Sequence, residues 1–302
     1  MAKLRRNHAD QAKASGGMIA KVGIFGAIAG GLYFLFSFFS GGEAPLIDGE
    51  SDEPSAYVGK DHFLPSEIRG SEVYHYKDYT LSYNEDYEQA DWVAYVLTNE
   101  NLIKPWTARN DNFRPDPAVR TGSASPDDYR GSGYDRGHMV PAADMAYDAV
   151  AMDETFLMSN ISPQSRNFNQ GIWRELEELT RDWAKKFKRL YIATGPVLSK
   201  EPKGYIGKDN EVAIPAAYYK VILDLDDPEQ KGIGFILDNE VNYEPLYKFA
   251  VSIDEVEALT GIDFYEDFMP VELEDELEGN FNIDLWPFNK GKYELRVEKW
   301  NQ

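Results

Sequence analysis

Apolar and polar positions after residue 72 fall in short runs that predict interspersed strands and helices. Runs rich in aromatic and β-branched residues are typical of strands, and four stand out, at 92–97, 190–193, 218–223 and 234–237. Residues 169–186 and 253–260 read instead as helices. The elements do not alternate as regular βαβ units, so the pattern favours an α+β fold with helices flanking a central mixed or antiparallel sheet.

The helix predicted at 169–186 has two stripes of different character. At about 100° per residue, one stripe should face the core and contains Ile172, Leu176, Leu179 and Trp183. The neighbouring stripe has i+4 spacing and contains Asn169, Trp173, Glu177 and Arg181. We expect Glu177 and Arg181 to pair and this stripe to border a cleft. Taken alone, the stripe favours a surface ion pair with a capping asparagine over a cleft.

The first 71 residues differ from the rest. Residues 1–17 are basic, and 18–40 have the length of a membrane-spanning helix, with no charged residue between 22 and 39. The positive-inside rule then predicts a signal-anchor, with the start of the chain in the cytoplasm and the following domain on the periplasmic or extracellular side. A cleaved signal peptide, which would give a secreted protein, is the alternative. Residues 41–71 resemble a flexible acidic linker, so the globular domain is expected at 72–302.

Composition limits the chemistry. The chain has 302 residues, 43% of them hydrophobic, and no cysteine, which excludes disulfide frameworks, thiolate zinc sites and cysteine nucleophiles. Its net charge of −21 is unfavourable for a nucleic-acid partner unless a cleft is locally basic. The acidic run at 267–279, in a C-terminal extension at 266–302, is more typical of a solvated face or tail than of a metal site.

Two nearby segments bring together the residue types of a hydrolytic site. His138, one of four histidines, lies in the run 134–141, and Asn160 opens a second run at 160–164. Asn169, Glu177 and Arg181 follow on the predicted helix. An imidazole, an amide oxygen, a carboxylate and a guanidinium are the groups needed to cut a phosphodiester with one hard metal ion.

These motifs resemble the DNA/RNA non-specific endonuclease family, the group that includes mitochondrial endonuclease G and secreted bacterial sugar-non-specific nucleases. The resemblance covers roughly 72–264, and both the order and the spacing of the motifs agree. The matching segments are Asp-Arg-Gly-His at 135–138, Asn-x-x-Pro-Gln at 160–164, Asn-Gln-Gly-x-Trp-x-x-Leu-Glu at 169–177, the arginine at 181, Thr-Gly-Pro at 194–196 and a closing segment at 251–264. The predicted membrane segment and the chain after 266 lie outside the shared core.

The resemblance implies a ββα-metal (His-Me finger) nuclease domain and a role for each matched residue. His138 is implied as the general base, and Asn169 as the only direct protein ligand of Mg²⁺, which Mn²⁺ would replace. Glu177 is implied to hold a metal-bound water. Arg181 and an upstream arginine would clamp the phosphate, and Arg109 is favoured over Arg114 for the upstream position. Three further residues are implied as supports: Arg136, Asn160 and the orienting Asp135.

The same resemblance implies the reaction. Because every implied contact goes to phosphate or metal, cleavage should be independent of base and sugar, acting on DNA and RNA, single or double stranded, and leaving 5′-phosphate and 3′-hydroxyl ends. A homodimer is also suggested. Two alternatives stay open: a phosphodiesterase for small nucleotides, and a catalytically dormant, membrane-anchored binding module.

Overall fold

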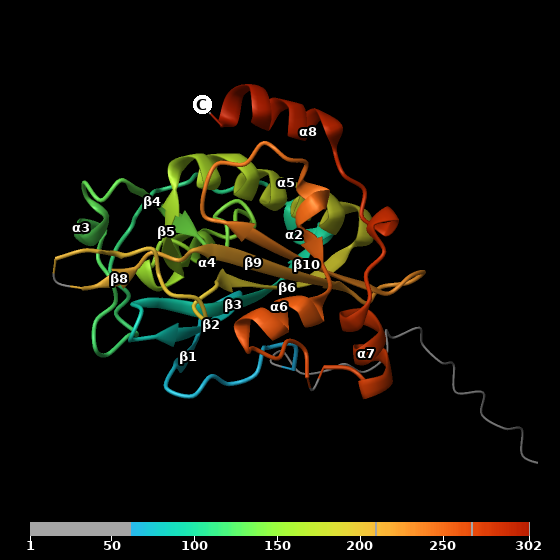
Figure 1. Ribbon diagram of the computed structural model, residues 1–302, viewed down its shortest axis with the longest axis horizontal. Helices are drawn as coiled ribbons and strands as arrows, with labels where there is room; N and C mark the ends of the chain where they lie inside the picture. Colours follow the sequence, from blue (N-terminus) through green and yellow to red (C-terminus); the bar gives the residue numbers. More distant parts are fainter. Residues whose placement is uncertain (1–61, 209, 267, 302) are drawn as a thin grey trace, which may run out of the picture. The chain divides into compact units, whose positions relative to one another are not determined.

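A seven-stranded antiparallel sheet forms the centre of the fold (Figure 1). The computed structural model describes residues 62–208, 210–266 and 268–301. In spatial order the strands are β1 (Glu72–His75), β2 (Tyr79–Asn84), β3 (Gln89–Thr98), β6 (Arg189–Pro196), β9 (Ala217–Asp224), β10 (Lys231–Asp238) and β11 (Ala250–Val251). The four strands expected from the sequence lie within β3, β6, β9 and β10, and the expected α+β class is confirmed.

The two faces of the sheet are covered by different helices. The helix α5 (Arg174–Phe187) lies over one face, and α6 (Ile253–Thr260) and α7 (Val271–Gly279) lie over the other (Figure 1). The central strand β9 is therefore buried at every position. Along it, Tyr218 packs toward α5, whereas Tyr219 packs toward α6. Burial on both faces explains why β9 shows a continuous apolar run rather than a strict alternation.

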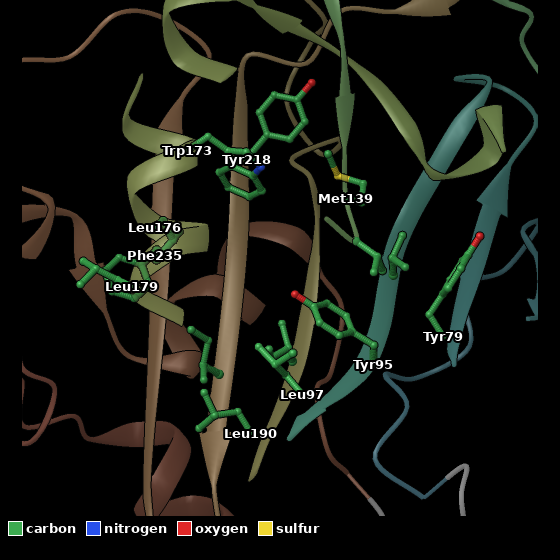
Figure 2. Packing of buried hydrophobic residues seen from close by; sticks show 14 of the residues in the cluster. Tyr79, Tyr95, Leu97, Met139, Trp173, Leu176, Leu179, Leu190, Tyr218 and Phe235 are labelled. Carbon is green, nitrogen blue, oxygen red and sulfur yellow. The ribbon is translucent and has the colours of Figure 1, made fainter. Parts of the chain in front are cut away.

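The core between α5 and the sheet confirms the first predicted stripe. Its four apolar residues are at most 1% exposed, and Figure 2 shows Leu176 and Leu179 of α5 beside Phe235 of β10. The second stripe is less polar than expected, because Trp173 is fully buried and packs against Phe168 and Tyr218. The expected pairing of Glu177 with Arg181 is wrong. Among the described residues, Arg181 forms its ion pair with Asp144, which lies on a loop 37 residues earlier.

Shorter elements connect these layers. The remaining α-helices are α2 (Asn99–Leu102), α3 (Pro126–Tyr129), α4 (Ala149–Glu154) and α8 (Lys290–Leu295). Two small sheets are formed by β4 (Tyr134–His138) with β5 (Ile161–Ser165) and by β7 (Tyr205–Ile206) with β8 (Val212–Ala213). Single turns of 3-10 helix are η1 (Met158–Asn160), η3 (Leu246–Phe249) and η4 (Ile283–Leu285), and turns of π-helix are η2 (Phe168–Trp173) and η5 (Arg296–Trp300).

The folded domain begins earlier than the sequence pattern indicates. Residues 62–71 were expected to belong to the linker, but Phe63 is buried, and Ser66 and Asp263 exchange two hydrogen bonds of 2.8 and 3.1 Å. The apolar residues of this segment have no periodicity, so only tertiary packing reveals their role. The expected segments 1–17 and 18–40, and the linker up to 61, lie outside the described residues. Within the described part, none of the helices combines the length and the apolar character needed to cross a bilayer.

The C-terminal extension is part of the domain. Trp286 is 1% exposed, and the Trp183 indole of α5 donates a hydrogen bond of 2.8 Å to the Pro287 carbonyl. Arg296 is fully buried, and its Nε lies 2.5 Å from the Glu175 carboxylate of α5. The same guanidinium donates to the backbone carbonyls of Asn242 and Glu244. The extension therefore braces α5.

Replacing Arg296 by Met should destabilise the protein strongly. The substitution leaves the Glu175 carboxylate buried without its partner, and breaking such a pair typically costs about 3–5 kcal/mol. The matched control is Lys290→Met, because the Lys290–Glu294 pair is exposed and an exposed pair contributes about 0–1 kcal/mol. Urea unfolding of both variants measures the difference. Equal midpoints for the two would show that the extension does not brace α5.

Candidate active site

Two antiparallel strands and a helix bring the motif residues together. In the β4–β5 pair, Asp135 lies opposite Gln164 and His138 lies opposite Ile161. The Gln164 side chain crosses β4 so closely that a Cβ on Gly137 would lie 2.2 Å from it. Only glycine fits there, which explains this position of the motif. The chain then passes through the π-helical turn η2 into α5.

Asn160 fixes the backbone that follows His138. Its side chain is fully buried. The amide oxygen accepts from the Val140 N–H at 2.9 Å, and the amide nitrogen donates to the carbonyls of Val140 and Thr155 at 3.1 and 2.9 Å. With its hydrogen bonds directed to backbone groups, Asn160 holds the end of β4 in place and does not reach the cavity.

The imidazole of His138 packs against two aromatic rings that also contact each other. The centroids of Phe113 and Phe156 lie 5.4 and 5.0 Å from the imidazole, both edge to face. Its Nε2 is buried and has no hydrogen-bond partner among the described protein atoms. Burial, together with the charges of Arg109 and Arg136, lowers the pKa of His138 to about 3, and Asp111 opposes this shift. The ring is therefore neutral at neutral pH.

Asn169 lies in the irregular turn η2 and is oriented by Asp135. Its amide nitrogen lies 3.1 Å from the Asp135 carboxylate, which also accepts from Gln170 at 3.2 Å. A carboxylate can only accept, so the nitrogen of the Asn169 amide must face it and the oxygen must face the other way. The backbone at Gly171 is non-helical, and π-type irregularities of this kind are frequent at functional sites.

Six of the eight sequence-predicted site residues line one cavity of about 270 Å³, together with Pro141, Ala142, Ala143, Gln170, Arg174 and Glu178. The six predicted residues are His138, Arg136, Asn169, Glu177, Arg181 and Arg109. A larger groove of about 690 Å³ shares four of the cavity's lining residues and includes Asp135. Of the two upstream arginine candidates, Arg109 lines both spaces. Arg114 lines neither, because it is bound to Asp153 at 2.6 Å.

The cavity and groove are more basic than the protein as a whole. Five arginines line them, against four carboxylates, in a chain of net charge −21. The arginines are Arg109, Arg130, Arg136, Arg174 and Arg181, and the carboxylates are Asp111, Asp135, Glu177 and Glu178. An anion can therefore be attracted locally despite the acidic surface.

Beneath the cavity lies a group of buried charges that sequence reasoning missed. Asp144 is 1% exposed and accepts from the Tyr95 hydroxyl at 2.9 Å and from Arg181 at 2.7 Å. The ammonium of Lys220, fully buried on β9, has no hydrogen-bond partner among the described atoms and lies 5.1 Å from the centre of the Trp173 ring. Asp144 carries no sequence signal. Lys220 does, as a lone charge within the apolar run 218–223.

The charges of this group modify the ionisation of Glu177, which lines the cavity. Burial raises the pKa of the Glu177 carboxyl to about 7; Arg181 and Lys220 oppose the shift, whereas Asp144 adds to it. Burial also lowers the pKa of Lys220 to about 8, against the effect of the Glu177 and Asp144 carboxylates. The cavity therefore combines a neutral imidazole, an amide oxygen, a carboxyl that titrates near neutrality and a fixed guanidinium.

Comparison with known proteins places this arrangement among nucleases. The DNA/RNA non-specific endonuclease family model matches residues 64–268, which include the whole cavity. Human mitochondrial nuclease EXOG is 32% identical over 80% of this chain and 70% of its own length. Nuclease C1 of Cunninghamella echinulata var. echinulata is 38% identical over 63% of this chain and 81% of its own. A chain from the crystal structure of the EndoG/EndoGI complex superposes with a TM-score of 0.62 at 30% identity, covering 70% of this chain and 91% of that one.

Lys220→Met should raise the pKa of Glu177 above its value of about 7, because the lysine charge favours the ionised carboxylate. At pH 7 a larger fraction of Glu177 would then be protonated. The titration can be followed by carbon NMR of labelled glutamate carboxyls, with Glu177→Gln to assign the signal. Lys231→Met is the matched control, since Lys231 is buried on the adjacent β10 but is paired with Asp224 at 2.6 Å. The electrostatic coupling is refuted when both variants leave the Glu177 titration unchanged.

Proposed function

The chain belongs to the DNA/RNA non-specific endonuclease family and is a nuclease, and we propose that it hydrolyses phosphodiester bonds with one divalent cation on Asn169 and His138 as general base. A single observation carries the proposal. His138, Asn169, Glu177 and Arg181 come from two separate segments and line one cavity. This brings a base, an oxygen ligand, a carboxylate and a guanidinium close enough to act on one phosphate.

The side chains of the cavity suit Mg²⁺, with Mn²⁺ as a substitute. Asp135 turns the oxygen of Asn169 away from itself, and Glu177 offers a carboxylate to the same cavity. Oxygen donors in small number fit Mg²⁺, which usually retains several of its waters. Asn169 would hold the ion directly and Glu177 through water. When bound, the ion supplies Lewis-acid stabilisation of the charge on the phosphate and the departing oxygen.

His138 is suited to accept the proton of the attacking water. The tautomer that carries its proton on the buried Nε2 has a free lone pair on Nδ1, which can accept a proton. In the free protein, Arg109 and Arg136 lower the pKa of this imidazole. A phosphodiester anion between the two guanidiniums would offset their charge and restore the basicity of the ring. Substrate binding would therefore strengthen the base where it is needed.

The arginines hold the phosphate without reading the bases. Arg181 is fixed by Asp144, and the guanidiniums of Arg109 and Arg136 lie 5.0 and 4.1 Å from the ring centres of Phe156 and Phe113. Contacts to phosphate position a nucleic acid but carry no sequence information. We therefore propose cleavage of DNA and RNA alike, single or double stranded, with 5′-phosphate and 3′-hydroxyl products.

The adjoining groove favours a polymer over a small nucleotide. Its volume of about 690 Å³ lies beside the smaller cavity and shares Arg109 and Arg136 with it. Tyr129, Tyr134 and Arg130 extend this surface beyond the reacting phosphate. A small phosphodiester would leave these residues unused, whereas the flanking nucleotides of a chain could lie along them.

His138→Ala and Asn169→Ala should each abolish most of the Mg²⁺-dependent cleavage of plasmid and of RNA by the purified protein. Loss of a positioned base typically costs about 10²–10⁴-fold in rate. His75→Ala is the matched control, because His75 lies exposed on β1, away from the cavity, and should keep full activity. The proposal fails when the wild type is inactive or when both cavity variants equal it. Activity confined to bis-nitrophenyl phosphate would point to a small-diester substrate instead.

We also propose that residues 18–40 anchor the chain in a membrane, with the nuclease domain on the non-cytoplasmic side. The basic stretch 1–17 before an uncharged run at 22–39 supports this orientation. Full-length protein should sediment with membranes and resist alkaline extraction. Protease added outside spheroplasts or intact cells should degrade the nuclease domain. Recovery of the uncleaved chain in the soluble fraction would contradict the anchor.

A further inference from the structure

A second group of oxygen ligands lies on the face of the sheet opposite α5. Asp254 and Glu257 belong to α6, and Glu278 lies near the end of α7; Figure 1 shows both helices below the sheet, with α5 above it. One carboxylate oxygen from each residue lies within 4.8 Å of the other two. We propose that these three carboxylates bind a structural Ca²⁺ ion, separate from the catalytic cation.

The buried carboxylate of Glu278 is the observation that points to a ligand. The residue is 4% exposed, and its Oε1 is buried without a hydrogen-bond partner among the described atoms. Within the described part of the chain, none of the three carboxylates forms an ion pair with lysine or arginine. Buried charges are normally paired or coordinate a metal, so this group requires a counter-charge.

Further carboxylates near Glu278 and Glu257 add to the negative charge of the group. Burial, followed by the neighbouring Glu257, Glu274, Asp263 and Asp254, raises the pKa of Glu278 to about 9. Burial also raises the pKa of Glu257 to about 7, with Asp263, Asp254 and Glu274 acting in the same direction. A divalent ion would neutralise the repulsion between these carboxylates.

The local backbone holds the three side chains toward one another. Glu257 accepts a hydrogen bond of 2.7 Å from the Phe264 N–H through Oε1, which leaves its other oxygen available. The Asp254 carboxylate reaches the C-terminal end of α7, where a Cβ on Gly279 would lie 3.3 Å from Oδ2. The C-terminus of a helix carries partial negative charge, so an aspartate is unfavourable there and a cation is favourable.

The donor set, three carboxylates from two helices, favours Ca²⁺ over Mg²⁺. Ligands of Ca²⁺ lie about 2.3–2.6 Å from the ion, so two of them can be separated by about 4.6–5.2 Å across it. Ligands of Mg²⁺, at about 2.0–2.1 Å, can be at most about 4.2 Å apart. The three oxygens all lie within 4.8 Å of one another, so ligand separations of this range can be accommodated around Ca²⁺. Calcium also tolerates the irregular geometry that three carboxylates from two helices provide.

The experiment uses full-length protein freed of metal by a chelator and carrying Asn169→Ala, so that the catalytic cation does not contribute. Addition of CaCl₂ should raise the thermal unfolding midpoint by roughly 5–10 °C at about a hundred times the dissociation constant. Calorimetric titration should give one ion per chain, with a dissociation constant up to about 10⁻³ M. MgCl₂ should have a much smaller effect.

Matched variants locate the site. Glu278→Gln, and Asp254→Asn at an exposed position that tolerates substitution, should each weaken Ca²⁺ binding at least tenfold. Glu272→Gln, an exposed glutamate of the same helix α7, should leave binding unchanged. The proposal is overturned when the midpoint of the parent does not respond to roughly 10 mM CaCl₂, ten times the weakest expected constant. It is equally overturned when both cluster variants bind Ca²⁺ as the parent does.

Discussion

The packing of α5 against the sheet is the constraint on which the active site depends. Leu176, Leu179 and Trp183 are buried on one side of this helix, as is Ile172 in the preceding turn η2, and burial of an apolar side chain stabilises the fold by about 1.5–3 kcal/mol. This burial fixes the rotation of the helix about its axis. Glu177 and Arg181, on the adjacent stripe, must then face the cavity. The orientation of Glu177 and Arg181 is therefore set by buried apolar residues that do not line the cavity.

Buried charges from the helix, a loop and the strand β9 lie close to one another beneath the cavity. Arg181 pairs with a buried Asp144, while the Lys220 ammonium has no hydrogen-bond partner among the described atoms and lies against the ring of Trp173. Replacing such charges by apolar groups is often neutral or stabilising, so stability alone does not explain them. Their effect on the pKa of Glu177 offers an explanation. Two cations and one anion beside a buried carboxyl leave its pKa at about 7, where small changes in its surroundings alter its charge.

The parts of the fold that could be predicted were those with a local signal. The run 253–260 ends at a glycine and matches α6, and the segments containing His138 and Asn169 are close in sequence, so that one strand pair and one helix suffice to bring them together. The partner of Arg181 could not be predicted, because an i+4 glutamate is a nearer candidate than an aspartate on a distant loop. Phe63 and Trp286 were missed for a related reason. Single apolar residues in polar segments show no period, and only contact with the finished sheet buries them.

The acidic surface and the basic cavity act at different ranges. The net charge of −21 repels a nucleic acid at a distance, but at physiological ionic strength the Debye length is about 8 Å, so this repulsion is largely screened before contact. Within the cavity, the arginines lie at contact distance, where water is partly excluded and screening is weaker. Affinity then comes from a few phosphates rather than from a long basic surface. On the proposed function, such binding would be weak for the polymer as a whole and strong at the bond to be cut, which suits an enzyme that must release its products.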